Sequence, residues 1–456
     1  MQHISVTRAK IQAGGTGAVG HVGLHALGAF ADRVGLPQAL SAAVGWTGER
    51  APVHDRGKVL THTMLMLAGG GNNCADIEHL RVEHRLFGSV ASDSTTYRTL
   101  RSIGPDTLVA LNDAFATIRR QVWARTSSTT GTGPVMLDID ASLVEIHSEN
   151  KEGAAAHFKG GYGFHPMFCF ADATGETLAA MLRPGNAAAN NIVDHLAVLD
   201  NAINQLPTDI ATGHRAGDLV SQVTRAVVVR TDSAGCTTGF ITGCHQRNIG
   251  FAVVARRSTQ IHSALLHTLV NDARWQPAVT QNGDPRPGAA VIELTDQVNL
   301  DQWPPGTRLI VRREPLHPGA QRSLFPSETF RYWGHYTNQA GTPVELDTIM
   351  RAHARVEDHI RRLKASGLER FPFTALDANR AWLQTVCQAA DLVSWFQHLC
   401  LDGPLAKAEP KTLRWRLWHT PARIARTGRD NIVRVLDGWP DTPAIVAAYE
   451  RIAQIT

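Results

Sequence analysis

Val135-Met-Leu-Asp-Ile-Asp-Ala-Ser-Leu143 is a short apolar run that carries two carboxylates, Asp138 and Asp140. It follows a Thr/Ser/Gly-rich linker over residues 126–133, so it predicts a buried β-strand that opens a new domain. Side chains two residues apart share one face of a strand. Asp138 and Asp140 should therefore point the same way, repel each other and lose hydration, and a cation would relieve both costs. The alternative is a strand end at which one aspartate caps a turn.

The composition is that of an ordinary core-forming protein. The chain has 456 residues, enough for about three domains at ~150 residues each. A net charge of +4 is compatible with nucleic-acid binding without demonstrating it. The 6 cysteines form no C-x-x-C pair, which favours reduced core cysteines. No apolar run approaches the ~20 residues of a membrane span and no signal peptide is visible, so we expect a soluble, cytoplasmic protein.

Residues 1–125 predict a helical region, because apolar residues recur in it at helical spacing. A short helix over residues 76–81, a glycine break and a second helix that begins at Ser92 are compatible with a helix-turn-helix. Hydroxyls and amides at a helix start suit phosphate contacts. The DNA-contacting side chains would be Tyr97, Arg98 and Arg101. An ordinary helical bundle is the alternative.

Residues 134–244 predict alternating strands and helices. Two more strands, joined by turns, follow the first within residues 157–182 and should complete an antiparallel meander. A helix over residues 192–206 comes next, capped by a polar loop, and then a β-branched run over residues 226–233. After a helix such a run is most naturally a parallel strand. It would place Asp232 at its carboxyl end, where ligands of open α/β sheets gather.

Residues 245–340 change to short β-like runs between Pro/Gly turns, which predicts a mostly β insertion. A helical pattern returns over residues 341–371, with apolar residues at i, i+4 and i+7. Glu357 lies at the edge of that apolar stripe, so its carboxylate can reach the sheet.

Residues 372–456 predict a helical C-terminal region. Arginines interleave with tryptophans over residues 411–429, with Arg414 and Arg416 among them. This mixture suits backbone phosphates and exposed bases. The alternative is a solvated basic face over core tryptophans.

Three carboxylates in this order form a candidate catalytic set: Asp140 on the first strand, Asp232 at the end of a later strand and Glu357 on a late helix. Strand, meander, helix, strand and late helix is the order of a ribonuclease H-like fold, with a mixed α/β sheet. Two Mg²⁺ or Mn²⁺ ions would fit three carboxylates, because hard cations prefer oxygen ligands. Metals ~3.5–4 Å apart can activate a water or 3′-hydroxyl and stabilise the leaving oxygen of a phosphodiester displacement.

Seven motifs carry a resemblance to a known family. They are Leu-Phe-Gly-Ser-Val-Ala-Ser-Asp-Ser-Thr (86–95), Leu-Asp-Ile-Asp-Ala-Ser (137–142), His-Ser-Glu-Asn-Lys-Glu-Gly-Ala (147–154), Lys-Gly-Gly-Tyr-Gly-Phe-His-Pro (159–166), Leu-Arg-Pro-Gly-Asn (182–186), Arg-Thr-Asp-Ser-Ala-Gly (230–235) and Arg-Val-Glu-Asp-His-Ile-Arg-Arg-Leu-Lys (355–364). The chain resembles the DDE transposases of bacterial insertion sequences, in the branch with a β-rich insertion before the catalytic glutamate. The resemblance implies that Asp140, Asp232 and Glu357 are the metal ligands, and the small residue and serine after Asp140 favour it over Asp138.

The resemblance also implies DNA contacts from the glutamate helix. In the broader branch, an arginine before the glutamate and a lysine seven residues after it contact the DNA backbone, and Lys364 has the required spacing. Met350 and His353 stand where the family has tyrosine and arginine. Arg355 is therefore the candidate substitute, and Arg361 is a further basic candidate on this helix.

Some relatives hold a flipped base against a tryptophan of the insertion, which offsets the cost of unstacking. Trp333 is the candidate here, with Trp303 second, and a buried strand aromatic is the alternative.

Taken together, the resemblance implies a transposase that binds terminal inverted repeats on double-stranded DNA and moves an insertion sequence by cut and paste. Two ends must be brought together, so we expect a homodimer on DNA, associated with the bacterial nucleoid. The alternatives are a ribonuclease H-like nuclease that joins no strands and an inactive sequence-specific DNA-binding protein. Zinc binding by Cys236, Cys244 and His245 fits no standard module.

Overall fold

A computed structural model describes the chain over residues 16–46, 51–126, 133–256, 258–268, 272–316, 330–427 and 430–455. Most of the linker over residues 126–133 and the end of the basic run, residues 428–429, lie outside this description.

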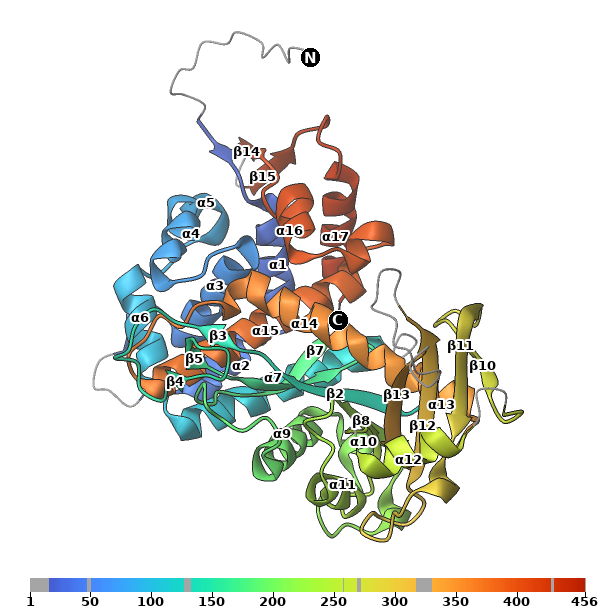
Figure 1. Cartoon of the computed structure of the whole chain (residues 1–456). Helices are drawn as coiled ribbons and strands as arrows, with labels where there is room; N and C mark the ends of the chain where they lie inside the picture. The colour runs from blue at the N-terminus through green and yellow to red at the C-terminus, as the bar shows by residue number, and fades with distance from the viewer. Residues whose placement is uncertain are drawn as a thin grey trace, which may run out of the picture.

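The N-terminal region is helical (Figure 1). Its elements are α1 (Val22–Arg33), α2 (Leu36–Val44), α3 (Arg56–Gly69), the 3₁₀ turn η1 (Cys74–Ile77), α4 (Glu78–Val82), α5 (His84–Phe87), α6 (Asp93–Arg101) and α7 (Pro105–Arg125). The predicted cap at Ser92 is confirmed, because its side chain accepts the Thr95 N–H at 3.3 Å. A two-residue strand, β1 (Ala18–Val19), precedes these helices.

A nine-stranded mixed sheet forms the centre of the molecule, in the order β10-β11-β12-β13-β9-β8-β2-β6-β7. The strands are β2 (Val135–Ala141), β6 (Met167–Ala171), β7 (Glu176–Met181), β8 (Val227–Thr231), β9 (Gly250–Val254), β10 (Gln276–Val279), β11 (Pro285–Glu293), β12 (Arg308–Pro315) and β13 (Phe330–Thr337). Strand β8 is parallel to β2 and to β9, and the other neighbours are antiparallel. The predicted mixed α/β architecture is confirmed.

The predicted second strand is divided in two. Residues 157–170 form β5 (Tyr162–Phe164) and then β6, with a break at His165 and Pro166. Proline lacks the N–H that would continue a ladder. Strand β5 instead pairs with β3 (Val144–Glu145) and β4 (Ala155–Ala156) in a separate small sheet.

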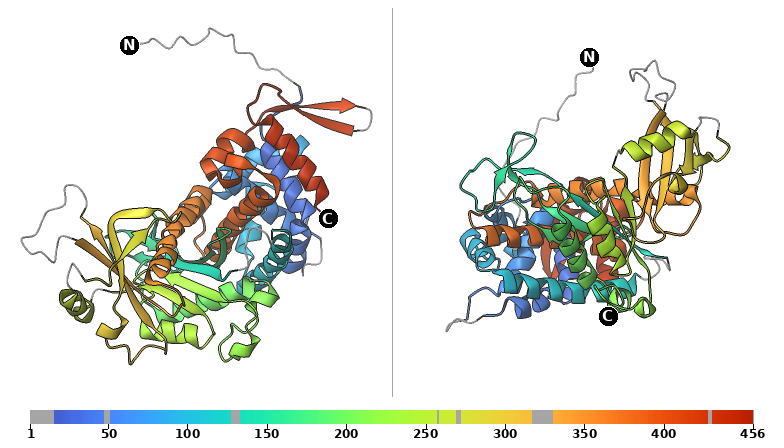
Figure 2. Two further views of the ribbon diagram at one scale, coloured as in Figure 1. Left: turned by 90° about the vertical axis from the view of Figure 1, so that its right-hand side faces the viewer. Right: turned by 60° about the horizontal axis from the view of Figure 1, so that its bottom comes forward.

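The predicted β insertion does not form a sheet of its own. Strands β10 to β13 continue the central sheet beyond β9 and extend it at one end of the molecule (Figure 2). The sequence pattern missed β10 and the helix α12 (Thr259–His267) within this segment. Because α12 is short, its apolar spacing is hard to distinguish from that of a strand.

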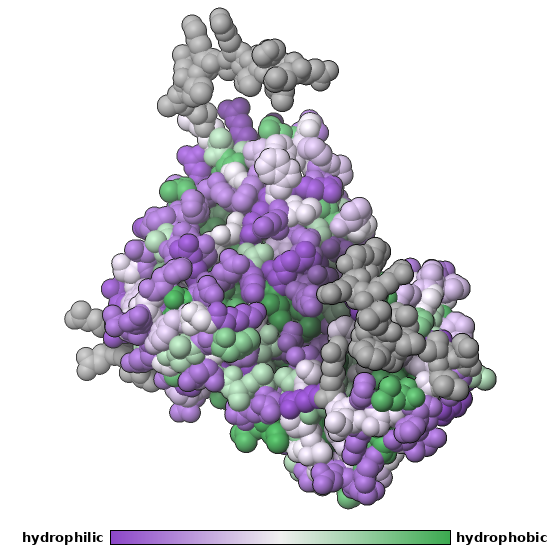
Figure 3. Space-filling view, in the orientation of Figure 1, coloured by the Kyte–Doolittle hydropathy of each residue, from purple (hydrophilic) through white to green (hydrophobic). Residues whose placement is uncertain are grey.

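Helices cover both faces of the sheet. On one face lie α9 (Ile192–Gln205) and α11 (Thr238–His245), whose apolar side chains share a core with Leu137 and Ile139 of β2. On the other face lie α14 (Arg355–Leu363) and α15 (Leu376–Cys400), which share a core with Phe168 and Phe170 of β6. Hydrophilic residues predominate on the outside of the helical upper part in Figure 3. Within the described ranges, no helix has the length and apolar character needed to cross a membrane.

A buried ionic network joins the N-terminal region, the sheet and the C-terminal region. Arg119 of α7 pairs with Glu176 of β7 and with Asp391 of α15, at 2.7 Å in each case. The indole N–H groups of Trp123 and Trp395 also donate to Glu176, at 2.6 and 2.7 Å. All five side chains are buried, so the three regions are fixed by directed bonds as well as by apolar packing.

The prediction of an entirely helical C-terminal region is wrong. After α15 and short turns come α16 (Pro410–Leu413), a hairpin of β14 (Ala422–Thr427) and β15 (Asp430–Val435), and α17 (Thr442–Gln454). Strand β14 also pairs with β1, and α17 packs against α1, so elements from the two terminal regions of the described chain pack against one another (Figure 1). β14 reads Ala-Arg-Ile-Ala-Arg-Thr and β15 reads Asp-Asn-Ile-Val-Arg-Val, so neither strand has the clean alternation of apolar and polar residues that would indicate it.

Candidate active site

Strands β2 and β8 bring Asp140 and Asp232 to the same edge of the sheet. In their parallel register Asp138 is opposite Arg230 and Ile139 is opposite Thr231. Strand β8 ends at Thr231, so Asp140 and Asp232 occupy the next two neighbouring positions at the carboxyl ends of the strands. Neighbouring strands lie about 4.8 Å apart, which places the two carboxylates side by side.

Helix α14 adds Glu357 to this edge. The helix packs on β2, with Val356 and Ile360 buried beneath it and Glu357 exposed beside them. It begins after α13 (Pro343–Arg351) and a 3₁₀ turn (Ala352–Ala354) and leads into a π-helical turn (Lys364–Leu368).

The three carboxylates act on one another electrostatically. Burial and the negative charges of Asp232 and Glu357 raise the pKa of Asp140 from 3.8 to about 6, although the Ala141 N–H and His353 oppose the rise. The Ala141 N–H donates to Asp140 Oδ1 at 2.7 Å. In the described part of the chain, no three His, Cys, Asp or Glu side chains are grouped closely enough to hold a metal ion. The donor set itself suits a hard divalent cation, because it consists of carboxylate oxygens whose repulsion a cation would relieve.

Asp138 shares a strand face with Asp140 but has a different environment. It is fully buried, and Arg230 donates to both of its oxygens, at 2.8 and 2.6 Å. His353 Nδ1 donates to Asp138 Oδ1 at 2.7 Å. Burial alone would raise the pKa of Asp138, but the hydrogen bonds from His353 and Arg230 outweigh it and hold that pKa below its ordinary value. The cation predicted to relieve this carboxylate is thus an arginine of the neighbouring strand.

Of the basic residues predicted on the glutamate helix, Arg355 and Arg361 have acidic partners within the chain. Arg355 pairs with Asp172 at 2.7 Å, and its side chain is 53% exposed. Arg361 is exposed and pairs with Asp358 at 2.7 Å. Lys364 is partly exposed where α14 ends.

The two candidate tryptophans of the insertion differ in exposure. Trp333 on β13 is 51% exposed, so the alternative of a buried aromatic is wrong at this position. Its partner in register on β12 is Arg312. Trp303 instead stacks on Tyr336, with ring centroids 4.4 Å apart, and packs against the core. Of the two candidate tryptophans of the insertion, Trp333 is therefore the one that is available to a ligand.

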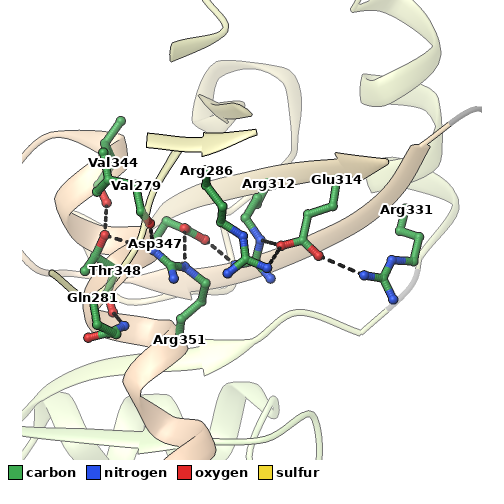
Figure 4. Close-up of polar contacts among 10 residues, drawn as sticks. All are labelled: Val279, Gln281, Arg286, Arg312, Glu314, Arg331, Val344, Asp347, Thr348 and Arg351. Carbon is green, nitrogen blue, oxygen red and sulfur yellow. Dashed lines mark hydrogen bonds and ion pairs between the residues drawn. The ribbon is translucent and has the colours of Figure 1, made fainter. Parts of the chain in front are cut away.

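An arginine cluster that the sequence patterns did not indicate surrounds two buried carboxylates, Glu314 and Asp347 (Figure 4), and one of its members, Arg312, is opposite Trp333 in the sheet. The ion pairs are Arg286–Glu314 at 2.5 Å, Arg312–Glu314 at 2.9 Å, Arg331–Glu314 at 3.1 Å, Arg312–Asp347 at 2.6 Å and Arg351–Asp347 at 2.8 Å. Four guanidinium groups against two carboxylates leave an excess of positive charge. Arg286 and Arg331 present part of this positive charge to solvent, because their side chains are 38% and 39% exposed.

The residues predicted for the N-terminal DNA contacts lie on α6. Arg98 and Arg101 are exposed, and Tyr97 is at the surface with its ring 4.8 Å from that of Phe373. Helix α6 packs against α15, which continues the helical body.

The predicted C-terminal arginines are bonded within the fold. Arg414 donates to the carbonyl oxygens at the end of α3, including that of Ala68 at 3.0 Å. Arg416 donates to both oxygens of Asp441, at 2.9 and 2.6 Å. Trp415, between them, is 82% exposed, whereas Trp382 and Trp395 of the same region are buried. The tryptophans of the C-terminal region thus lie both in the core and at the surface.

The weak zinc hypothesis receives no support from the geometry. Cys236 and Cys244 are buried, as are the other four cysteines, and His245 is exposed. Burial raises the pKa of the Cys236 and Cys244 thiols, which disfavours the thiolate that zinc requires.

A comparison with protein families agrees with the predicted resemblance. Residues 2–456 match a family model described as "Transposase DDE domain group 1". Among solved structures, the chain is similar to a piggyBac transposase synaptic complex with hairpin DNA, at 10% identity, with 87% of this chain and 80% of that chain covered and a TM-score of 0.41. A comparison with curated proteins finds no match.

Proposed function

Since the chain belongs to the "Transposase DDE domain group 1" family and is thus a DNA-cleaving and strand-transferring enzyme, we propose that it is the transposase of a bacterial insertion sequence. It would bind the terminal inverted repeats of its element and move the element by cut and paste. The observation that carries this proposal is that the charges of Asp232 and Glu357 act on Asp140 at the carboxyl ends of the central strands.

The catalytic core would be ribonuclease H-like and formed by residues 134–244 and 341–371. Support comes from the strand order β7-β6-β2-β8-β9. Strands β7, β2, β8 and β9 run in one direction, and β6 alone runs antiparallel to them. Residues 245–340 would be the insertion before the catalytic glutamate. In open sheets of this kind, ligands bind at the carboxyl ends of parallel strands, where Asp140 and Asp232 lie.

Asp140, Asp232 and Glu357 would hold two Mg²⁺ or Mn²⁺ ions. Bound there, the ions would supply activation of a water or 3′-hydroxyl and stabilisation of the leaving oxygen. The chain's own contribution would be to bring the three carboxylates within reach of the same ions in spite of their repulsion. The raised pKa of Asp140 in the free protein is a cost of that arrangement.

DNA would lie across the same edge and the insertion. Trp333 would stack on an unpaired base, and the arginine cluster would bind the phosphates of that strand. Lys364, Arg355 and Arg361 would contact the backbone near the cleaved phosphate. Residues 1–125 and 372–456, with Tyr97, Arg98 and Arg101 on α6, would bind the terminal repeat.

Pairing of two ends would require a homodimer on DNA, with the protein associated with the nucleoid.

In the C-terminal region the exposed Trp415 is a stronger candidate for a DNA contact than Arg414 and Arg416, because both arginines already have partners in the fold.

A cleavage and joining assay tests the proposal. Purified protein would be incubated with Mg²⁺ and labelled duplexes that carry the ends of the element, and with a target plasmid. We expect the unmodified protein to give nicked, excised and joined products, and Asp232→Ala to give none. Asp113→Ala, which removes an exposed carboxylate of α7, is the control and should behave like the unmodified protein. Cleavage and joining by Asp232→Ala at the normal rate would refute the proposed active site, and cleavage without joining would indicate a nuclease.

A further inference from the structure

We propose that Asp138, Arg230 and His353 form a positioning layer that sets the relative placement of the three candidate catalytic carboxylates. The inference rests on the proposed function, because it assigns these residues a role toward Asp140, Asp232 and Glu357. None of the three would touch substrate or metal, so they are positioning residues rather than catalytic ones.

The spacing of these residues in the sequence is the same on both strands. Asp138 precedes Asp140 by two residues on β2, and Arg230 precedes Asp232 by two residues on β8 and its end. A two-residue step in a strand returns to the same face. Asp138 and Arg230 therefore each lie one two-residue step further from the carboxyl end of the strand than a candidate ligand.

His353 and Glu357 show the corresponding spacing for a helix. His353 precedes Glu357 by four residues, which is about one helical turn. It lies in the 3₁₀ turn that leads into α14, on the side that faces β2, since its ring reaches Asp138. Each of the three elements thus contributes one residue to the candidate site and one to the layer below it.

The bonds within the layer are short and directed. Arg230 donates to both carboxylate oxygens of Asp138, at 2.8 and 2.6 Å, and His353 donates to one of these oxygens at 2.7 Å. Arg230 and Asp138 are 1% and 0% exposed, so water cannot replace these bonds without a rearrangement. A charge-assisted, bidentate pair fixes orientation as well as distance.

Arg230 also connects the layer to its surroundings. Its Nη1 donates to the carbonyl oxygen of Ile349 in α13 at 2.8 Å, and its Nη2 lies 3.1 Å from Asp172. One guanidinium therefore bonds to β2, to the segment after β6 and to the helix before Glu357. If β8 or the turn that carries His353 shifted relative to β2, the buried Asp138 would lose a partner, and a buried carboxylate without partners is strongly disfavoured.

The physical consequence is preorganisation. Asp140, Asp232 and Glu357 repel one another in the metal-free protein, so without restraint they would move apart. The layer below them couples the same three elements through attraction, and it opposes that separation. Outer partners of metal ligands typically change metal affinity or activity by about 10–100-fold when they are removed.

The test compares metal binding and cleavage in variants of the layer with those in a matched structural variant. His353→Ala removes one restraint, and His353→Asn keeps a side-chain N–H donor near the same position. Arg247→Met is the control, because it breaks another bidentate arginine–carboxylate pair away from the candidate site, with Asp200 at 2.6 and 2.8 Å, in which the arginine is mostly buried. Mn²⁺ affinity is measured by electron paramagnetic resonance on the DNA-free protein, and the Mg²⁺ concentration for half-maximal cleavage is measured with end-containing DNA.

We expect His353→Ala to weaken Mn²⁺ affinity and to raise the Mg²⁺ requirement by about 10-fold or more, and His353→Asn to restore most of both. Arg247→Met should lower the Tm without changing either metal measurement. Unchanged metal affinity and Mg²⁺ requirement in His353→Ala would overturn the positioning role. An equal change in Arg247→Met would also overturn it, because general destabilisation would then explain the effect.

Two additional variants keep the outcome decisive. If His353→Ala does not fold, Asp138→Asn takes its place, because it keeps the shape of the side chain and removes its charge, and the same expectations and refutations apply. Asp140→Asn in the same assays separates the two proposals. Loss of cleavage in Asp140→Asn together with normal metal binding in the layer variants would refute the layer alone, whereas normal cleavage by Asp140→Asn would refute the proposed active site.

Discussion

The substitution Asp140→Asn should abolish cleavage and at the same time stabilise the metal-free protein. Burial and the charges of Asp232 and Glu357 raise the pKa of Asp140 from 3.8 to about 6. That displacement of about two pH units corresponds to about 3 kcal/mol of unfavourable interaction of the ionised form. Because the side chain is partly exposed and solvent screens its charge, we expect a gain of about 1–2 kcal/mol from the substitution. Asparagine keeps the acceptor for the Ala141 N–H, so the local turn should survive.

The sign of the pH dependence follows from linkage. The pKa of Asp140 in the folded protein lies above its unfolded value, so the carboxyl binds its proton more tightly when folded. Its unfavourable contribution is absent below about pH 3.8, grows as the pH rises through about 6, and is complete above that. The advantage of Asp140→Asn should therefore be small at pH 4 and full at pH 7.5.

The assay is thermal unfolding in a chelator at both pH values, with the Tm compared between the unmodified protein and Asp140→Asn. A gain of 1–2 kcal/mol should raise the Tm by about 2 °C or more at pH 7.5. The control Asp113→Asn removes an exposed carboxylate of α7 and should leave the Tm unchanged. Added Mg²⁺ should stabilise the unmodified protein and have less effect on Asp140→Asn. A Tm at pH 7.5 that is unchanged or lower in Asp140→Asn, or a gain that persists at pH 4, would refute the reasoning.

Three other predictions concern the framework and the DNA surface. Arg119→Met leaves two buried carboxylates without their cation and should cost about 3–5 kcal/mol in chemical denaturation, whereas Arg120→Met at an exposed position of the same helix should cost little. Trp333→Ala should weaken binding of DNA with an unpaired end by about 1–3 kcal/mol and leave the Tm unchanged, as measured by fluorescence anisotropy, and equal binding would contradict a stacking role. Arg286→Ala and Arg331→Ala should each reduce the slope of log affinity against log salt by about 1, and an unchanged slope would exclude contact with phosphates.

Local patterns predicted the elements well where the signal lies within a few residues. The cap at Ser92, the strand at Asp140 and the helix after Asn191 follow from capping chemistry and side-chain periodicity, and all three are present. The same patterns failed in the C-terminal region. The prominent tryptophans and arginines around Trp415 suggested helices, but β14 and β15 depend on pairing with each other and with the distant β1.

The site could be predicted only in part, because its decisive contacts join distant segments. Asp140 and its neighbours in the sequence indicated a carboxylate site, and the family match confirms the resemblance on which the set was chosen. Nothing in the sequence near Glu314 indicated that three arginines would converge on it, since Arg286, Arg312 and Arg331 come from three strands. Such clusters follow from sheet order, which single-sequence patterns do not specify.

Asp138 and Asp140 show how one position on a neighbouring strand determines the role of a carboxylate. The two side chains lie on the same face of β2 and would have similar chemistry in isolation. Across the parallel register, Asp138 faces Arg230, whereas Asp140 reaches the position of Asp232. The first carboxylate therefore has its charge neutralised inside the protein and keeps a low pKa, whereas burial and the negative charge of Asp232 raise the pKa of the second. A carboxylate whose charge the fold neutralises can support the structure, and one whose charge the fold leaves uncompensated has a reason to bind a cation from solution.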